Sequence, residues 1–249
     1  MSVYNLISQY ILIIGSIVAL VFLAVAGNEK RAAAGLTRQN WKSAVLIVLA
    51  FVGIYIVRTV VSVAVQGVSD GSGMQYVKEW AAMFKNPMMW LNIAALPINY
   101  FFVFIAFFGE EYGWRYYLQP VLQKRFGLRA GVIILGIVWG LWHIPDDLFY
   151  YTQTSGIQMI FAQQITCISL GIFFAYAYMK TQNIWVPVCL HYLNNNLIPI
   201  ISGTFSADVL ENQTVSWKDL PVALVLNGLC FGFFLLADVF KKKEVQEEE

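Results

Sequence analysis

The stretch SAVLIVLAFVGIYIVRTVVSVAVQ, residues 43–66, contains a single charged side chain, that of Arg58. A membrane-spanning helix requires about 20 consecutive, mostly apolar residues, so this stretch predicts a transmembrane helix. Its apolar residues follow one another without the alternation that marks a strand of a membrane β-barrel. Because backbone polar groups in lipid must be satisfied within the segment, a helix is the expected structure.

Further apolar segments continue this pattern through the chain, at 4–26, 90–109, 129–148, 157–179, 184–202 and 220–240. The composition agrees, because 59% of the residues are hydrophobic and 12% are charged, whereas a soluble domain is about one quarter charged. We therefore predict an all-α polytopic transmembrane bundle of about seven spanning helices. Residues 1–249 are expected to form a single integral membrane domain in the lipid bilayer. The net charge of +1 indicates no nucleic-acid partner.

Positive charge recurs in alternate connectors between these segments. The basic residues concerned are Lys30, Arg31, Arg38 and Lys42, then Lys124, Arg125 and Arg129, then Lys180, and finally Lys241, Lys242 and Lys243. Cytoplasmic loops carry an excess of Lys and Arg, so the N-terminus is expected outside and the C-terminus in the cytoplasm. The remaining connectors are mixed or acidic, and the pair Asp146-Asp147 is expected in one of these loops.

The first polar cluster is Gly109-Glu110-Glu111-Tyr112-Gly113-Trp114-Arg115. Ionisable groups at membrane depth cost a few kcal/mol each and are functional candidates. On a helix, Glu111 and Arg115 are i,i+4 neighbours and can form an ion pair, while Glu110 points about 100° away. One carboxylate is then neutralised and the other stays available as a general base or acid. The alternative interpretation is a capping cluster where the helix meets water.

Both histidines of the chain lie inside predicted spans. His143 has no charged neighbour in its segment before Asp146. His191 and Asn195 are i,i+4 neighbours that face the same way, so they could hold a carbonyl oxygen as its charge develops. The alternatives are a satisfied core histidine and hydrogen bonds between helices. Since structural histidines would also be expected in loops, the clusters together predict one polar site.

These clusters resemble the motifs of the CPBP family of intramembrane proteases, also called the CAAX-protease and bacteriocin-processing or Abi family. The family pattern is EExxxR, FxxxH and HxxxN or HxxxD on separate helices. Residues 110–115 match the first motif and residues 191–195 match the third. In the second motif Trp139 replaces the usual Phe before His143, so an aromatic residue is retained. The resemblance implies a protease core at about 90–202.

The resemblance implies a membrane endopeptidase that acts on a membrane-associated peptide or protein, such as a prenylated CAAX substrate, a bacteriocin or a signal peptide. Two mechanisms are compatible with the side chains. In the first, which requires no cofactor, Glu110 and His143 activate a water molecule. His191 and Asn195 then stabilise the oxyanion, and the ion pair at 111–115 organises Glu110.

In the second mechanism Glu110, His143 and His191 bind zinc, with an open position for water. The chain contains no HExxH motif, and Asn195 suits an oxyanion role better than a ligand role. The resemblance therefore favours the first mechanism and keeps zinc as the alternative cofactor.

A simple count of spans places Glu110 and His143 at different depths. Glu110 falls near the cytoplasmic end of its helix, whereas His143 lies roughly 18 Å beyond the cytoplasmic start of the next one. Either the third helix continues past Arg115, or the segment 116–128 re-enters the membrane, which is allowed where it lines a cavity. An amphipathic helix is expected there, with the site on the cytoplasmic side of the midplane. Its expected wetter side consists of Gln119, Gln123 and Lys124.

Functions from two other classes fit the same residues. A non-catalytic membrane scaffold or regulator could retain the fold, but the intact Glu110, His143 and His191 argue against it. A proton-coupled transporter would use buried Glu and His residues as relays, yet the chain shows no inverted repeat, which such a transporter favours. Arg58 has no partner that the sequence predicts.

Overall fold

The computed structural model describes residues 3–26, 35–36, 39–202, 211 and 213–241. All regular secondary structure within these residues is helical, so the predicted all-α class is confirmed. Of the basic residues used to predict the orientation, those outside the described residues are Lys30, Arg31, Arg38, Lys242 and Lys243.

A helix forms at each predicted apolar segment. The elements are α1 (Val3–Val25), α3 (Trp41–Asp70), α4 (Gly73–Lys85), α5 (Pro87–Glu111), η1 (Tyr112–Leu118), α6 (Gln119–Phe126), α7 (Leu128–Trp142), α8 (Ile144–Phe149), α9 (Gly156–Thr181), α10 (Trp185–Ser202), α11 (Asp219–Cys230), η2 (Gly232–Leu236) and η3 (Asp238–Phe240). The predicted span at 220–240 is wrong beyond Cys230, where 3-10 turns replace the α-helix. The chain leaves the α-helix where the buried ring of Phe231 packs against Phe51 and Phe173.

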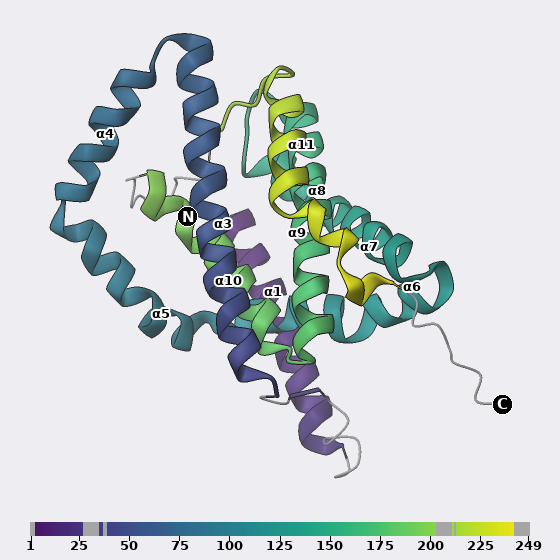
Figure 1. Cartoon of the computed structure of the whole chain (residues 1–249). Helices are drawn as coiled ribbons and strands as arrows, with labels where there is room; N and C mark the ends of the chain where they lie inside the picture. Colours follow the sequence, from purple (N-terminus) through teal and green to yellow (C-terminus); the bar gives the residue numbers. More distant parts are fainter. Residues whose placement is uncertain (1–2, 27–34, 37–38, 203–210, 212, 242–249) are drawn as a thin grey trace.

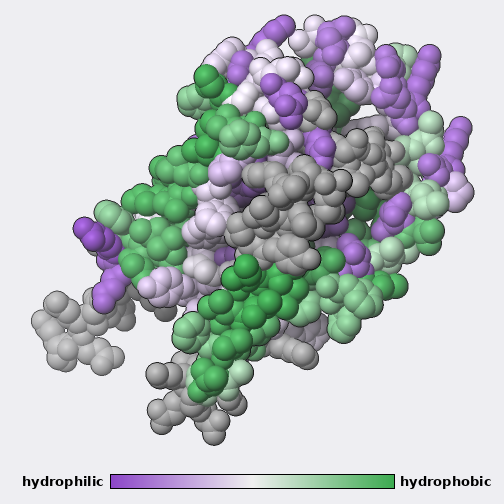
Figure 2. Space-filling model, turned by 180° about the vertical axis from the view of Figure 1, so that it is seen from behind, coloured by the Kyte–Doolittle hydropathy of each residue, from purple (hydrophilic) through white to green (hydrophobic). Residues whose placement is uncertain are grey.

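Within the described residues, four helical segments are long and apolar enough to cross a membrane. They are Trp41–Asp70, Pro87–Phe126, Leu128–Phe149 and Gly156–Thr181. Large apolar side chains such as Leu46 and Phe102 lie exposed on them, as lipid-facing residues do. Figure 2 shows broad hydrophobic surface in green, with hydrophilic residues gathered mainly toward the top and the right edge. The chain is an integral membrane protein.

Helix α9 lies at the centre and packs against α7, α10 and α11, while α3, α4 and α5 form an arch to one side (Figure 1). The α7–α9 contact is close because residue 136 is a glycine. A Cβ atom at Gly136 would lie 2.6 Å from the Cα atom of Ile168. Small residues permit such close approach between membrane helices.

Helix α4 falls in a connector that was expected to be a loop. Its sequence places apolar and charged residues on opposite faces, with Lys78, Glu79 and Lys85 on the polar side. The apolar side chains of Met74 and Phe84 are exposed, and among the described elements α4 packs mainly against α3 and α5.

The helix that carries Glu110 does not end there. Helix α5 continues without a break into the π-helix η1 and then into α6, so of the two alternatives the structure has the helix that continues past Arg115. In η1 the Gln119 N–H reaches back to the Trp114 carbonyl. π-Helices are rare and occur frequently at functional sites.

The predicted sidedness of the segment after Arg115 is wrong for Gln119 and Gln123, whereas Lys124 is exposed. Gln119, expected on the wetter side, is buried, whereas Tyr117 is 69% exposed. Gln123 also turns inward, and its Nε2 donates to the Leu128 carbonyl at 3.1 Å. In an apolar surrounding, polar side chains find hydrogen-bond partners only inside the protein. The glutamines of this segment therefore turn inward, and apolar side chains turn outward.

Candidate active site

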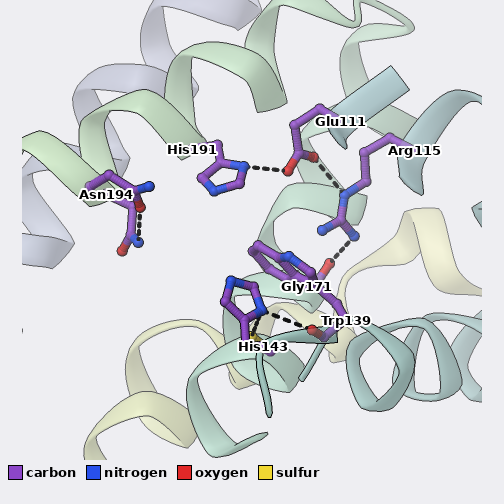
Figure 3. A network of polar contacts seen from close by, with 9 residues as sticks. Glu111, Arg115, Trp139, His143, Gly171, His191 and Asn194 are labelled. Carbon is purple, nitrogen blue, oxygen red and sulfur yellow. Dashed lines mark hydrogen bonds and ion pairs between the residues drawn. The ribbon is translucent and has the colours of Figure 1, made fainter. Parts of the chain in front are cut away.

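The carboxylate of Glu111 connects two helices at the centre of the site. Its Oε2 atom lies 2.9 Å from Arg115 Nε, and its Oε1 atom lies 2.9 Å from His191 Nδ1 (Figure 3). The predicted i,i+4 ion pair is therefore confirmed. Glu111 and Arg115 are both 0% exposed, and His191 is 4% exposed, so water does not screen this network.

Arg115 is fully buried in the protein. Its Nη1 atom donates to the Gly171 carbonyl of α9 at 3.1 Å (Figure 3). Its guanidinium also lies over the rings of Trp139 and Phe174, at 5.3 and 5.5 Å from their centroids. Cation–π contacts and a buried counterion together favour a charged guanidinium at this depth. Arg115 thereby joins η1 to α7 and α9.

Both imidazoles lie against the Trp139 ring. The ring centroid of Trp139 is 5.4 Å from that of His191 and 5.8 Å from that of His143. The Nδ1 atom of His143 lies 2.9 Å from the Trp139 carbonyl and 3.8 Å from Cys167 Sγ. When Nδ1 donates to the carbonyl, the Nε2 atom of His143 is left as the basic nitrogen.

Glu110 differs from Glu111 in lacking a fixed partner. Its Oε2 atom is buried and accepts no hydrogen bond from any described residue. Its carboxylate interacts electrostatically with His191 and Cys167, so it belongs to the same cluster. Glu110 also lines a pocket of about 330 Å³ together with Trp114 and Trp142. Glu110 thus combines a buried oxygen that has no partner among the described residues with a place in the wall of a pocket.

Asn195 lies outside this buried network. It is exposed, and its Oδ1 accepts a hydrogen bond from Asn194 Nδ2 at 3.1 Å. In Figure 3 Asn194 lies apart from the bonds that join His191, Glu111 and Arg115. The structure therefore joins Glu111, Arg115 and His191 directly, places both histidines against Trp139, and leaves Asn195 outside these contacts.

The donors suggested for zinc do not fit that metal as they are placed. Within the part of the chain that the structure describes, no three His, Cys, Asp or Glu side chains converge into a metal-binding group.

Asp147 is a residue whose burial the sequence did not predict. It belongs to α8 rather than to a loop, it is buried, and neither carboxylate oxygen has a hydrogen-bond partner among the described residues. Cys167 likewise carried no signal in its spacing, yet it lies beside His143. The aromatic position of the second motif was the one signal that pointed to Trp139, which contacts both histidines.

The fold and this network define an integral membrane protein with a buried glutamate, arginine and histidine centre. Residues 91–197 match the family described as Type II CAAX prenyl endopeptidase Rce1-like. The chain is also 28% identical over 125 residues to CAAX prenyl protease 2 of Methanococcus maripaludis. That match covers 47% of this chain and 45% of the relative, so the chain spans less than half the length of that curated protein. No solved structure matches the chain significantly.

These matches confirm the resemblance seen in the motifs, since the matched segment contains all of them. The segment that carries the site is therefore similar to Rce1-like CAAX prenyl endopeptidases.

Proposed function

We propose that this protein is an intramembrane endopeptidase of the CAAX-protease type, which hydrolyses a peptide bond in a membrane-associated peptide. The observation that carries the proposal is the contrast between two adjacent carboxylates. Glu111 is bound by Arg115 and His191, whereas Oε2 of Glu110 has no hydrogen-bond partner among the described residues, and Glu110 lines a pocket. We take this oxygen as the one that accepts a proton from water.

In the proposed reaction Glu110 and His143 activate a water molecule. The water oxygen bonds to the scissile carbonyl carbon as its proton passes to the Glu110–His143 pair, and the carbonyl becomes an oxyanion. The carbon–nitrogen bond then breaks, and the same pair returns the proton to the leaving amine. Hydrogen-bonding of His143 Nδ1 to Trp139 orients the ring and leaves Nε2 for this transfer.

His191 is proposed to stabilise the oxyanion. Its Nδ1 atom is held by Glu111, so a protonated ring presents Nε2–H as a donor. Asn195 is proposed as the second donor. Because its Oδ1 is occupied by Asn194, its Nδ2 is left to donate.

We further propose how the chain is oriented in the membrane and on which side the site opens. Residues 1–249 form a single membrane domain with the protease core at about 90–202. The N-terminus lies outside and the C-terminus in the cytoplasm, and the site opens on the cytoplasmic side of the midplane. The partners in this proposal are the lipid bilayer and a membrane-associated peptide or protein. That substrate is a prenylated protein, a bacteriocin or a signal peptide.

The test uses purified full-length protein in nanodiscs with a library of lipidated and leader peptides. The wild type should yield defined fragments, and Glu110→Gln should reduce cleavage by about 100-fold or more. The melting temperature should not change, because Glu110 Oε2 makes no bond in the structure. His143→Gln and His191→Gln should also abolish cleavage. Glu79→Gln, at an exposed site on α4, is the matched control and should cleave normally.

Unchanged cleavage in Glu110→Gln would contradict the proposal. Proton-coupled uptake into vesicles in the absence of any cleavage would favour the transporter alternative.

A further inference from the structure

The pocket beside Glu110 has walls that are apolar except for one carboxylate. Three glycines, Gly15, Gly109 and Gly113, line it from two different helical segments together with Trp114 and Trp142. Glu110 supplies the single charged side chain among the lining residues. The lining is that of a binding site for an apolar group placed next to a polar one.

The size of the pocket limits what that group can be. Its volume is about 330 Å³, whereas an apolar cavity of about 150 Å³ holds one benzene molecule. A large aliphatic or aromatic side chain, up to an indole, therefore fits. The glycines provide this space, because a Cβ atom at Gly113 or at Gly15 would meet no atom within 4 Å.

One wall of the pocket comes from α1, which lies outside the segment matched to the protease family. Helix α1 packs on α5 at this level, where Ser16 Oγ donates to the Ile105 carbonyl. A Cβ atom at Gly109 would collide with Ser16, so the crossing depends on that glycine. The position of Gly15 is thus set by a close helix contact beside Glu110.

We propose that this pocket binds the apolar side chain of the substrate residue next to the scissile bond, and that Gly113 and Gly15 set the largest side chain accepted. The inference rests on the proposed peptidase function. Glu110 activates water for attack on the scissile carbonyl, and it lines the pocket. The substrate side chain nearest that carbonyl therefore enters the space between Glu110, Gly113 and α1.

The test measures kcat/KM on quenched peptides that carry Ala, Leu, Phe or Trp at each position flanking the cleaved bond. The kcat/KM of the Trp peptide divided by that of the Ala peptide should fall by about tenfold or more in Gly113→Leu and in Gly15→Leu. The added side chain would fill space in the pocket, and such a change in size discriminates between substrates on that scale. Gly113→Ala should lower the ratio less. Gly53→Leu is the matched control, because Gly53 also lies in a membrane helix with nothing within 4 Å, and its ratio should not change.

The ratio is independent of the fraction of folded enzyme, so a loss of folding cannot imitate the result. An unchanged ratio in Gly113→Leu and Gly15→Leu would overturn the inference while leaving the proposed function intact. If Gly113→Leu cleaves no peptide, Gly113→Ala takes its place. An equal decrease of kcat/KM for all peptides in Gly113→Ala would then overturn the inference. Failure of the wild type to cleave any peptide would instead remove the proposed function, and the inference with it.

Discussion

Glu111 Oε1 accepts a hydrogen bond from His191 Nδ1 at 2.9 Å, across a sequence separation of 80 residues. The same carboxylate binds Arg115 through its other oxygen, also at 2.9 Å. One side chain therefore joins α10 to the α5–η1 segment and fixes the orientation of an imidazole. The buried network depends on Glu111, whereas the chemistry is proposed for its neighbour Glu110.

Replacement of Glu111 should destabilise the protein. Glu111→Gln keeps the size of the side chain but leaves the guanidinium of Arg115 buried without its counterion, a change that costs about 3–5 kcal/mol. Thermal unfolding in nanodiscs should show a clearly lower melting temperature. Glu79→Gln, where the carboxylate is exposed and bonded to Gln75, should leave it unchanged. Equal melting temperatures for both variants would contradict the structural role of Glu111.

Asn195→Ala should impair turnover more than stability. Loss of one oxyanion donor lowers kcat by about 10²–10³, while the melting temperature should stay constant because Asn195 is exposed. Asn196→Ala is the control, since the Asn196 amide donates to the Tyr192 carbonyl of its own helix. A similar kcat for the two variants would show that Asn195 has no special part in the reaction.

Removal of metal should leave cleavage unchanged. No three metal-ligating side chains converge among the described residues. Activity should persist after dialysis against a strong chelator, and mass spectrometry should find far less than one zinc ion per chain. Activity that is lost on chelation and restored by zinc would require the ligands to rearrange and would favour the alternative mechanism.

Arg58 should stabilise the bundle through Asn227. Its Nη1 atom donates to Asn227 Oδ1 at 2.8 Å, and its guanidinium lies 4.7 Å from the Tyr55 ring centroid. These contacts give Arg58 the partners that its sequence context did not reveal. A double-mutant cycle with Arg58→Met and Asn227→Leu should yield a coupling of about 1.5 kcal/mol or more, as for hydrogen bonds to charged groups. Equilibrium unfolding in mixed micelles measures it, and additive effects would contradict the interaction.

Gly136→Ala should weaken the packing of α7 on α9. The added Cβ atom would lie 2.6 Å from Ile168 Cα, and a backbone atom cannot rotate away as a side chain can. Gly53→Ala, at a position open on all sides, should instead be neutral or stabilising by about 0.5–1 kcal/mol, because alanine favours a helix. Thermal unfolding compares the two directly. A melting temperature for Gly136→Ala at or above that of the wild type would contradict the close contact.

The sequence was sufficient for features that lie within one helix. Apolar runs of spanning length predicted the helices because lipid requires each segment to satisfy its own backbone groups. The Glu111–Arg115 pair was predictable because i,i+4 neighbours share one face. Both histidines were also singled out, since imidazoles in apolar spans are costly.

Contacts between helices were decided by the tertiary structure alone. Periodicity does not reveal how far each helix is rotated, so it could not show that His191 meets Glu111 or that Gln119 faces inward. Nor could it place Gly15 beside Glu110, because that pocket wall depends on the close crossing of α1 and α5. The sequence alone thus identified the residue types of the site, whereas the packing of the helices determined which of these residues contact one another.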